Sequence, residues 1–587
     1  MSARGADTPA QAERPREITP AELGFTPQPA VRWLAPGVLV ATGVKALLAT
    51  IFGAYADKRE LQGSLPARVY RHGDDETGEV WFDFVADLGD GFNATYTVAS
   101  LLAADELDVP SAGKLPRGEM LIMGGDQVYP AASVTAYRNR TKGVYAAALP
   151  HVDGKRPTLY ALPGNHDWYD GLTAFLRVFA QGRPFGGWDT AQTRSYFAIQ
   201  LPQRWWLFAL DTQFDDHIDA PQLAYFTEAA KQLREGDSVI LCTPSPSWVD
   251  AHTSRGAEAW DTIEYFDTTI VRPAGATIRV MLSGDKHHYS RYAERGGGRQ
   301  EVTCGLGGGY LTTTDELPES VVLPPPTTRI RAAGPSTRYD LAARYPEKRQ
   351  SRRFAAGILR LPFRNPGFWG VAGIIQSLIV LAVLYGLAGP FGDRPRGFFA
   401  LVASWTPAVL LAVLVVVGWV AFARLDLRTS RLRGTVFGVA HAAVHLGLSL
   451  AWGLLITELY RDVIPDDVLS NWVSFVVILV GLPTVLGLVH SEVVAVYLMI
   501  ASRFGINLNE LMAGQSIEDH KGFLRMHIAA DGTLRIYPIK VEKVCRRWVA
   551  DPDGAPGDPL LRPHGVQLRP QLIEDPVVVT PRDEPNR

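Results

Sequence analysis

The sequence predicts an α/β domain, followed by a four-helix transmembrane region and a small C-terminal β element. Between residues 79 and 310, short apolar runs alternate with helix-like stretches, which is the pattern of strands that alternate with helices. These runs are apolar throughout, which is typical of strands that are buried on both faces. Beyond residue 365, four apolar segments each reach the roughly 20 residues that a helix needs to cross a bilayer.

Length, charge and cysteine content narrow the class of protein. With 587 residues, the chain is long enough for three or more units. The net charge of -3, from 58 Lys and Arg against 61 Asp and Glu, gives no support for nucleic acid as a partner. The 3 cysteines, Cys242, Cys304 and Cys545, lie far apart, form no CxxC pair and fit a reducing compartment.

The N-terminal part is predicted to contain a disordered tail and one helix. Residues 1–29 are rich in Ala, Pro, Glu, Thr and Arg and lack apolar periodicity, so we expect a disordered tail. Residues 30–60 contain an apolar stretch at 33–55, with Lys45 near its middle and apolar side chains on roughly one helical face. This pattern favours an amphipathic helix on the membrane surface or packed on the domain, with a membrane span as the alternative.

The predicted domain covers residues 79–312, and the Pro- and Arg-rich residues 313–365 are predicted to form a linker. Within residues 366–500, four transmembrane helices are expected near 368–389, 398–422, 435–458 and 472–499.

The charges between these segments predict their orientation. Lys and Arg side chains precede the first span and separate the second from the third: Lys348, Arg349, Arg352, Arg353, Arg360, Arg364, Arg424, Arg428, Arg431 and Arg433. Asp462, Asp466 and Asp467 lie between the third and fourth spans. Because cytoplasmic flanks carry the excess of Lys and Arg, we expect a multi-pass protein of the cell (inner) membrane with the large domain and the C-terminus in the cytoplasm.

The C-terminal part is expected to be small and partly disordered. Asp531-Gly532 separates two apolar-rich runs, which predicts a hairpin within a small β element at residues 505–550, docked on the large domain. Residues 551–587 are rich in Pro and Asp and are predicted to be disordered.

Polar residues end the apolar runs of the domain again and again. They are Asp87 and Asp90, then Asp126, then Asn165, His166 and Asp167, then Asp211, then Thr243 and Ser245, and finally Asp285, His287 and His288. In open α/β sheets, the site lies beyond the carboxyl ends of the strands, so these side chains are expected to converge. Carboxylates, amide oxygens and imidazoles bind divalent cations, which predicts a metal site that holds one ion or two.

The order of these motifs resembles the calcineurin-like metallophosphoesterases. Gly164-Asn165-His166-Asp167 resembles their GNHD signature, and Gly125-Asp126 resembles their Gly-Asp motif. Asp87 resembles the first Asp of their Asp-x-His motif, and the segment Gly284 to His287 resembles their closing Gly-His-x-His motif. The resemblance covers roughly residues 80–310. It implies a calcineurin-like αββα sandwich and hydrolysis of a phosphate ester by hydroxide generated at the metal.

The resemblance also implies roles for individual residues. One ion would be held by Asp87, Asp126 and His287, and a second by Asp126, Asn165 and Asp285. His166 would protonate or stabilise the leaving oxygen, with Asp167 orienting its imidazole. His288 and Arg291 follow the closing motif, and apart from the resemblance we expect them to contact the substrate phosphate; the alternatives are that His288 supports the site and that Arg291 caps the sheet.

Several positions depart from the family pattern. Gly89 and Asp285 stand where the family has histidines, and CTPSPSW offers Thr243 or Ser245 in place of another. Asp90 is expected to replace one missing imidazole. The shift from nitrogen to oxygen ligands favours Mn²⁺, Mg²⁺ or Ca²⁺ over an Fe–Zn pair, which stays the alternative.

Two interpretations of function follow. The first is a membrane-anchored, metal-dependent phosphoesterase whose partners are the lipid bilayer and a phosphate ester, with a lipid-derived ester as one option. The second is a degenerate domain that binds a phosphorylated ligand and signals to the membrane helices. His441, His445, His490 and Glu492 lie within predicted spans, where an intramembrane polar site or interhelical hydrogen bonding would account for them.

Overall fold

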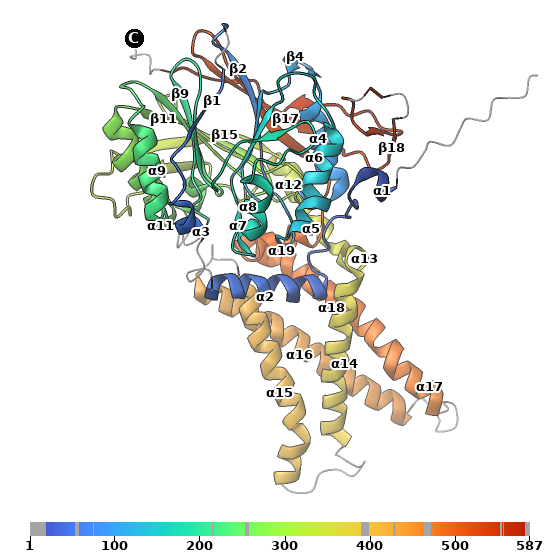
Figure 1. Cartoon of the computed structure of the whole chain (residues 1–587). Helices are drawn as coiled ribbons and strands as arrows, with labels where there is room; N and C mark the ends of the chain where they lie inside the picture. Colours follow the sequence, from blue (N-terminus) through green and yellow to red (C-terminus); the bar gives the residue numbers. More distant parts are fainter. Residues whose placement is uncertain are drawn as a thin grey trace, which may run out of the picture.

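Figure 1 shows the computed structural model, in which a domain built on β-sheets lies against a group of long helices. The structure describes residues 19–52, 58–73, 76–213, 217–252, 257–388, 398–425, 430–462, 471–551, 554–555 and 557–581.

The first large sheet has nine strands in the order β1-β8-β9-β10-β11-β13-β12-β15-β14. Their bounds, in the same order, are Val69–Arg71, Phe197–Gln200, Trp205–Ala209, Ser238–Cys242, Thr277–Ser283, Gln300–Cys304, Tyr289–Glu294, Thr337–Tyr345 and Ser320–Leu323. Strands β9, β10, β11 and β13 pair in parallel, so their carboxyl ends lie at the same edge.

The second large sheet has eight strands, seven of them in the order β20-β17-β16-β2-β5-β6-β7, with β21 also pairing β17. The bounds are Gln571–Leu572, Leu534–Val541, Lys521–Ile528, Val80–Val85, Met120–Met123, Thr158–Ala161, Asp189–Thr190 and, for β21, Val577–Val579. Strands β2, β5, β6 and β7 pair in parallel, which again brings their carboxyl ends to one edge.

Three apolar clusters hold the domain together. One draws its buried residues from both sheets, with Phe82 and Ile122 from the second and Leu207 and Val280 from the first. The other cluster of the second sheet includes residues of α4 (Phe92–Ala103), α6 (Gly143–Ala148) and α8 (Thr173–Phe179). The other cluster of the first sheet includes residues of α9 (Ala220–Ala230) and α11 (Ala257–Phe266). The domain is therefore a mixed α/β unit in which buried strands position the polar residues that follow them.

The C-terminal strands are part of the second sheet, which corrects two predictions. The hairpin of β16 and β17 forms, but β16 pairs with β2 in the interior of the large sheet rather than in a separate small element. Residues 551–587 are not a disordered tail throughout, since β19 (Leu561–Pro563) pairs with β18 (Trp548–Ala550) and β20 and β21 pair with β17. Val577 and Val579 are buried while Val578 is exposed, so this short alternating run outweighs the Pro- and Asp-rich composition around it.

The linker and the N-terminal tail are corrected as well. Residues 313–365 contain β14 and β15, which extend the first sheet beyond β12, and α12 (Lys348–Ala355). Of the predicted tail, residues 19–29 lie on the domain: Phe25 is buried, and the Phe92 N–H donates to the Gln28 carbonyl at 2.9 Å. Residues 1–18 lie outside the described part of the chain.

A buried ion pair joins β16 to β2. The Arg525 guanidinium donates to both carboxylate oxygens of Asp83, at 2.8 and 3.0 Å, and neither side chain is exposed. We expect Arg525→Met to lower the free energy of unfolding by about 3–5 kcal/mol, because it leaves a buried carboxylate without its partner. Denaturant unfolding in detergent would measure this. Replacing both partners by Met and Leu should recover most of the loss, whereas a single-variant loss below about 1 kcal/mol would contradict the buried pairing.

Within the described residues, four helices are long and apolar enough to cross a membrane, as predicted: Pro366–Leu387, Phe399–Ala423, Arg431–Leu459 and Val477–Phe504. They belong to α14 (Pro366–Ala388), α15 (Phe398–Ala423), α16 (Arg431–Asp462) and the segment that runs through α18 (Leu482–Ala501). Their orientation stays a prediction, and Arg428, Asp466 and Asp467 lie outside the described residues.

Helix α2 (Pro36–Phe52) lies between the domain and the long helices and runs across them (Figure 1). Its Leu39, Val40, Val44 and Leu47 are exposed. An exposed apolar face beside candidate membrane helices supports the expectation of a helix at the membrane surface.

Three histidines form a chain between two long helices. His441 Nε2 lies 2.6 Å from His445 Nε2, and His445 Nδ1 lies 2.6 Å from His490 Nδ1. His441 and His445 are both on α16 and His490 is on α18, so the second of these contacts joins two helices. Glu492 lies two residues further along α18.

Candidate metal centre

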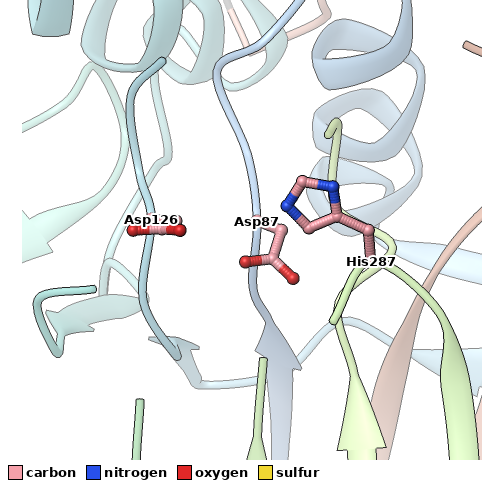
Figure 2. Close-up of side chains that lie close together, drawn as sticks. All are labelled: Asp87, Asp126 and His287. Atoms are coloured by element: carbon pink, nitrogen blue, oxygen red, sulfur yellow. The ribbon is translucent and has the colours of Figure 1, made fainter. Parts of the chain in front are cut away.

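The structure brings together three predicted ligands from three strand ends. Asp87 follows β2, Asp126 follows β5 and His287 follows β11. Figure 2 shows the three side chains side by side; one ligand atom from each lies within 4.8 Å of the others, and all three residues are buried. Among the described His, Cys, Asp and Glu residues, these three form the group with this geometry. The residues that follow parallel strands of both sheets therefore lie close together.

The backbone at these strand ends is unusual. Asp87 has φ 59°, Asp126 has φ 52° and His287 has φ 49°, all in the left-handed region. Such conformations cost on the order of 1 kcal/mol or more and persist where the surrounding structure enforces them. Here they turn each chain sharply after its strand.

Two glycines make room for the carboxylates of the donor set. A Cβ on Gly305 would lie 1.9 Å from Asp87 Oδ2, and a Cβ on Gly164 would lie 2.2 Å from Asp126 Oδ1. Burial, together with the Asp126 and Asp285 carboxylates, raises the pKa of Asp87 well above its usual value. Burial also raises the pKa of Asp126. Two buried carboxylates and an imidazole are a donor set suited to a divalent ion. The positive charge of such an ion would lower the pKa values of Asp87 and Asp126 again.

This fit makes Gly305 a test of the site. We expect Gly305→Ala to weaken metal affinity by at least 10-fold, because its methyl group displaces the Asp87 carboxylate. Elemental analysis and calorimetric titration of the folded protein would measure the affinity. Gly370→Ala is the matched control, since a Cβ at Gly370 meets nothing within 4 Å. Unchanged affinity in Gly305→Ala would place the ion elsewhere.

His287 presents the tautomer that a metal ligand needs. Its Nδ1 lies 2.8 Å from the Tyr310 carbonyl oxygen, so Nδ1–H donates there and Nε2 carries the lone pair. Burial lowers the pKa of His287 to about 3, which keeps the ring neutral near pH 7.

Tyr129 belongs to the site although the sequence did not reveal it. Its hydroxyl lies 2.8 Å from His287 Nε2, 3.1 Å from Asp126 Oδ2 and 3.3 Å from Asp87 Oδ1. Burial, followed by the charges of Asp126 and Asp87, raises the pKa of Tyr129 well above its usual value. The phenol can thus donate a hydrogen bond to the ligands or, beside a cation, offer a further oxygen. Its position three residues after Asp126, in the same strand-end loop, was the available signal.

His166 and Asp167 play separate parts. The His166 N–H donates to Asp126 Oδ1 at 2.9 Å, and His166 Nδ1 lies 2.7 Å from the Pro130 carbonyl oxygen. The prediction that Asp167 orients this imidazole is wrong, because the Pro130 carbonyl does so. Asp167 accepts the Gly164 N–H at 2.8 Å and a hydrogen bond from the Tyr137 hydroxyl. It therefore fixes the loop that carries His166.

Asn165 and Asp285 lie beside the three-residue group. The Asn165 amide donates to the Tyr169 hydroxyl at 3.3 Å. The Asp285 N–H donates to Asp87 Oδ1 at 3.1 Å, while the Asp285 carboxylate pairs with Lys286 at 2.6 Å. Their predicted role as ligands of a second ion stays a prediction.

Asp90 has a different role from the one predicted. Its carboxylate accepts the Val31 N–H at 2.8 Å and the Trp33 indole N–H at 3.3 Å. It therefore fastens the segment before α2 to the domain instead of replacing an imidazole.

Arg291 binds two other side chains, and its predicted contact with a substrate phosphate stays a prediction. Arg291 donates to both carboxylate oxygens of Glu574, at 2.8 and 2.6 Å, and to Gln300 at 2.7 Å. His288 Nδ1 lies 3.1 Å from the Thr312 hydroxyl, and a substrate contact by His288 stays a prediction.

The remaining strand-end residues have structural partners. Asp211 accepts the Trp168 indole N–H at 3.1 Å, and burial raises the pKa of Asp211 to about 7. The Thr243 hydroxyl donates to the Ser245 carbonyl at 3.1 Å.

Comparisons with known proteins give weak structural similarity only. No model of a protein family matches the chain, and no curated protein matches it. Similar solved structures include GAP50, described as the anchor in the inner membrane complex of Plasmodium, with a TM-score of 0.30 and 13% identity over 40% of this chain and 74% of that chain. They also include PhoD, with a TM-score of 0.27 and 12% identity over 40% of this chain and 59% of PhoD. TM-scores this low do not define the function of this chain.

Proposed function

We propose that the chain is a membrane-associated, metal-dependent phosphoesterase. The observation that carries this proposal is the convergence of Asp87, Asp126 and His287 with the Tyr129 hydroxyl in a buried, glycine-lined space. The order of the motifs along the chain supports it, as does a mixed α/β domain whose two sheets share buried residues in one apolar cluster.

The chemistry divides between the ions and the side chains. Divalent ions, when bound, polarise a phosphoryl group and lower the pKa of a water molecule. Asp87, Asp126 and His287 would hold one ion, and Asp126, Asn165 and Asp285 a second. The predominance of oxygen donors favours Mn²⁺, Mg²⁺ or Ca²⁺, with Fe and Zn as the alternative.

His166 is the proposed proton donor to the leaving oxygen. Because Nδ1–H donates to the Pro130 carbonyl, Nε2 is the atom that can meet a substrate. The His166 backbone N–H donates to Asp126, so the residue that would take part in holding both ions also positions the proposed proton donor. The domain and the C-terminus would face the cytoplasm.

The experiment is hydrolysis of soluble aryl phosphate monoesters and diesters by the full-length protein in detergent. After chelation, Mn²⁺, Mg²⁺, Ca²⁺ and Zn²⁺ are added back in turn. Metal-dependent turnover is expected. Stoichiometric metal without turnover of any ester would contradict the proposal and favour the ligand-binding sensor.

A further inference from the structure

An apolar cavity of about 560 Å³ lies between α2 and the long helices. Leu34 and Leu39 line it from the side of α2, Phe368 and Ile375 from α14, Leu414 from α15 and Leu498 from α18. The volume falls in the roughly 300–1,000 Å³ range of ligand sites. Walls this apolar suit a hydrocarbon chain.

One short segment, Trp33-Leu34, connects the cavity with the candidate metal centre. Leu34 is the neighbour of Trp33, whose ring lies 5.6 Å from that of Tyr129 and 5.5 Å from that of His166. The Trp33 indole N–H donates to Asp90, which fixes the ring over these two residues. One short segment thus touches the proposed proton donor with one side chain and lines the cavity with the next.

The surroundings are those of a lipid site. The exposed apolar side chains of α2 lie beside the candidate membrane helices, and Figure 1 places α7 (Asn165–Trp168), which carries His166, on the side of the domain that faces α2. A lipid in the adjoining bilayer leaflet would therefore present its headgroup to the domain and its chain to the cavity.

We propose that the substrate is a membrane lipid whose phosphate ester enters the metal centre while an acyl chain occupies this cavity. This inference rests on the proposed phosphoesterase function. Trp33 contacts His166 at the metal centre, and its neighbour Leu34 lines the cavity. Trp33 is therefore the positioning residue that sets where the acyl chain leaves the polar site.

Chain length should then govern both turnover and binding. Each buried methylene contributes about fourfold to binding. For acylglycerol phosphates that are monomeric in water, below their critical micelle concentrations, kcat/KM is therefore expected to rise at least about 100-fold when the acyl chain is longer by about four methylenes. Native mass spectrometry of metal-free protein should show retention of a long-chain alkyl phosphate and no retention of butyl phosphate.

A pair of glycine variants separates the cavity from a general effect of micelles. Gly418 lines the cavity, and a Cβ there meets nothing within 4 Å, so Gly418→Leu fills the cavity without a clash at Cβ. Gly447 on α16 has the same open surroundings and does not line this cavity, so Gly447→Leu is the control. Gly418→Leu should lower long-chain kcat/KM and chain retention at least about 10-fold and leave turnover of aryl phosphates unchanged.

The outcomes are distinct. Suppose that the protein hydrolyses aryl phosphates but that kcat/KM for acylglycerol phosphates does not depend on chain length, or that Gly418→Leu and Gly447→Leu lower it equally. Either result would overturn this inference and leave the phosphoesterase function standing. No turnover of any ester by metal-loaded protein would overturn both.

Discussion

Asp126→Asn is expected to reduce hydrolysis by on the order of 10³-fold or more, equivalent to about 4 kcal/mol in the barrier. Asp126 lies at the centre of the site, since its Oδ1 accepts the His166 N–H and its Oδ2 accepts the Tyr129 hydroxyl. Asparagine keeps the shape of the side chain but removes the charge that would bind both ions. Turnover and metal content are measured together, and Asp153→Asn on an exposed loop is the control.

The stability of the same variant separates function from folding. Burial raises the pKa of Asp126 above its unfolded value, so the native state holds its proton more tightly than the unfolded state does. This contribution is present at low pH and is lost as pH rises through the folded pKa. At neutral pH, metal-free Asp126→Asn should therefore unfold at the same Tm as the unaltered protein or a higher one. A large drop in Tm would attribute the lost activity to misfolding.

His166→Ala is expected to lower kcat by about 10²–10⁴-fold for esters with alkyl leaving groups. For nitrophenyl esters the loss should be less than about 10-fold, because a nitrophenolate departs without a proton from a general acid. Metal content should not change. His151→Ala is the control, since this exposed histidine pairs with Asp153.

The contrast between leaving groups decides the role of His166. Equal losses for alkyl and nitrophenyl esters, accompanied by loss of metal, would contradict the role of proton donor. His166 would then act by holding Asp126 in place.

Local patterns were enough to predict the strands, the long helices and the central ligands. The apolar runs of β2, β5 and β11 are buried because both faces of each strand are covered, and the residue after each run lies at the shared carboxyl edge. This is why Asp87, Asp126 and His287 could be placed together without knowledge of the strand order.

Contacts between distant segments were not predictable in this way. Arg291 pairs with Glu574, which lies in a segment that composition predicts to be disordered, and Asp90 accepts the N–H of Val31, which lies next to the predicted N-terminal tail. In both cases the partner comes from a terminal segment whose contacts with the domain were not predicted, so the partner of the side chain was not predicted either. Similarly, β16 pairs with β2 over more than 400 residues, and no local pattern encodes such a pairing.

The most direct test of the central claim is the anomalous scattering of crystals grown with Mn²⁺ and measured at the manganese edge. We expect a peak at about 2.0–2.3 Å from Asp87, Asp126 and His287 Nε2 in the unaltered protein, and its loss in Asp126→Asn. A manganese peak away from these three side chains in active protein would show that they do not form the metal centre.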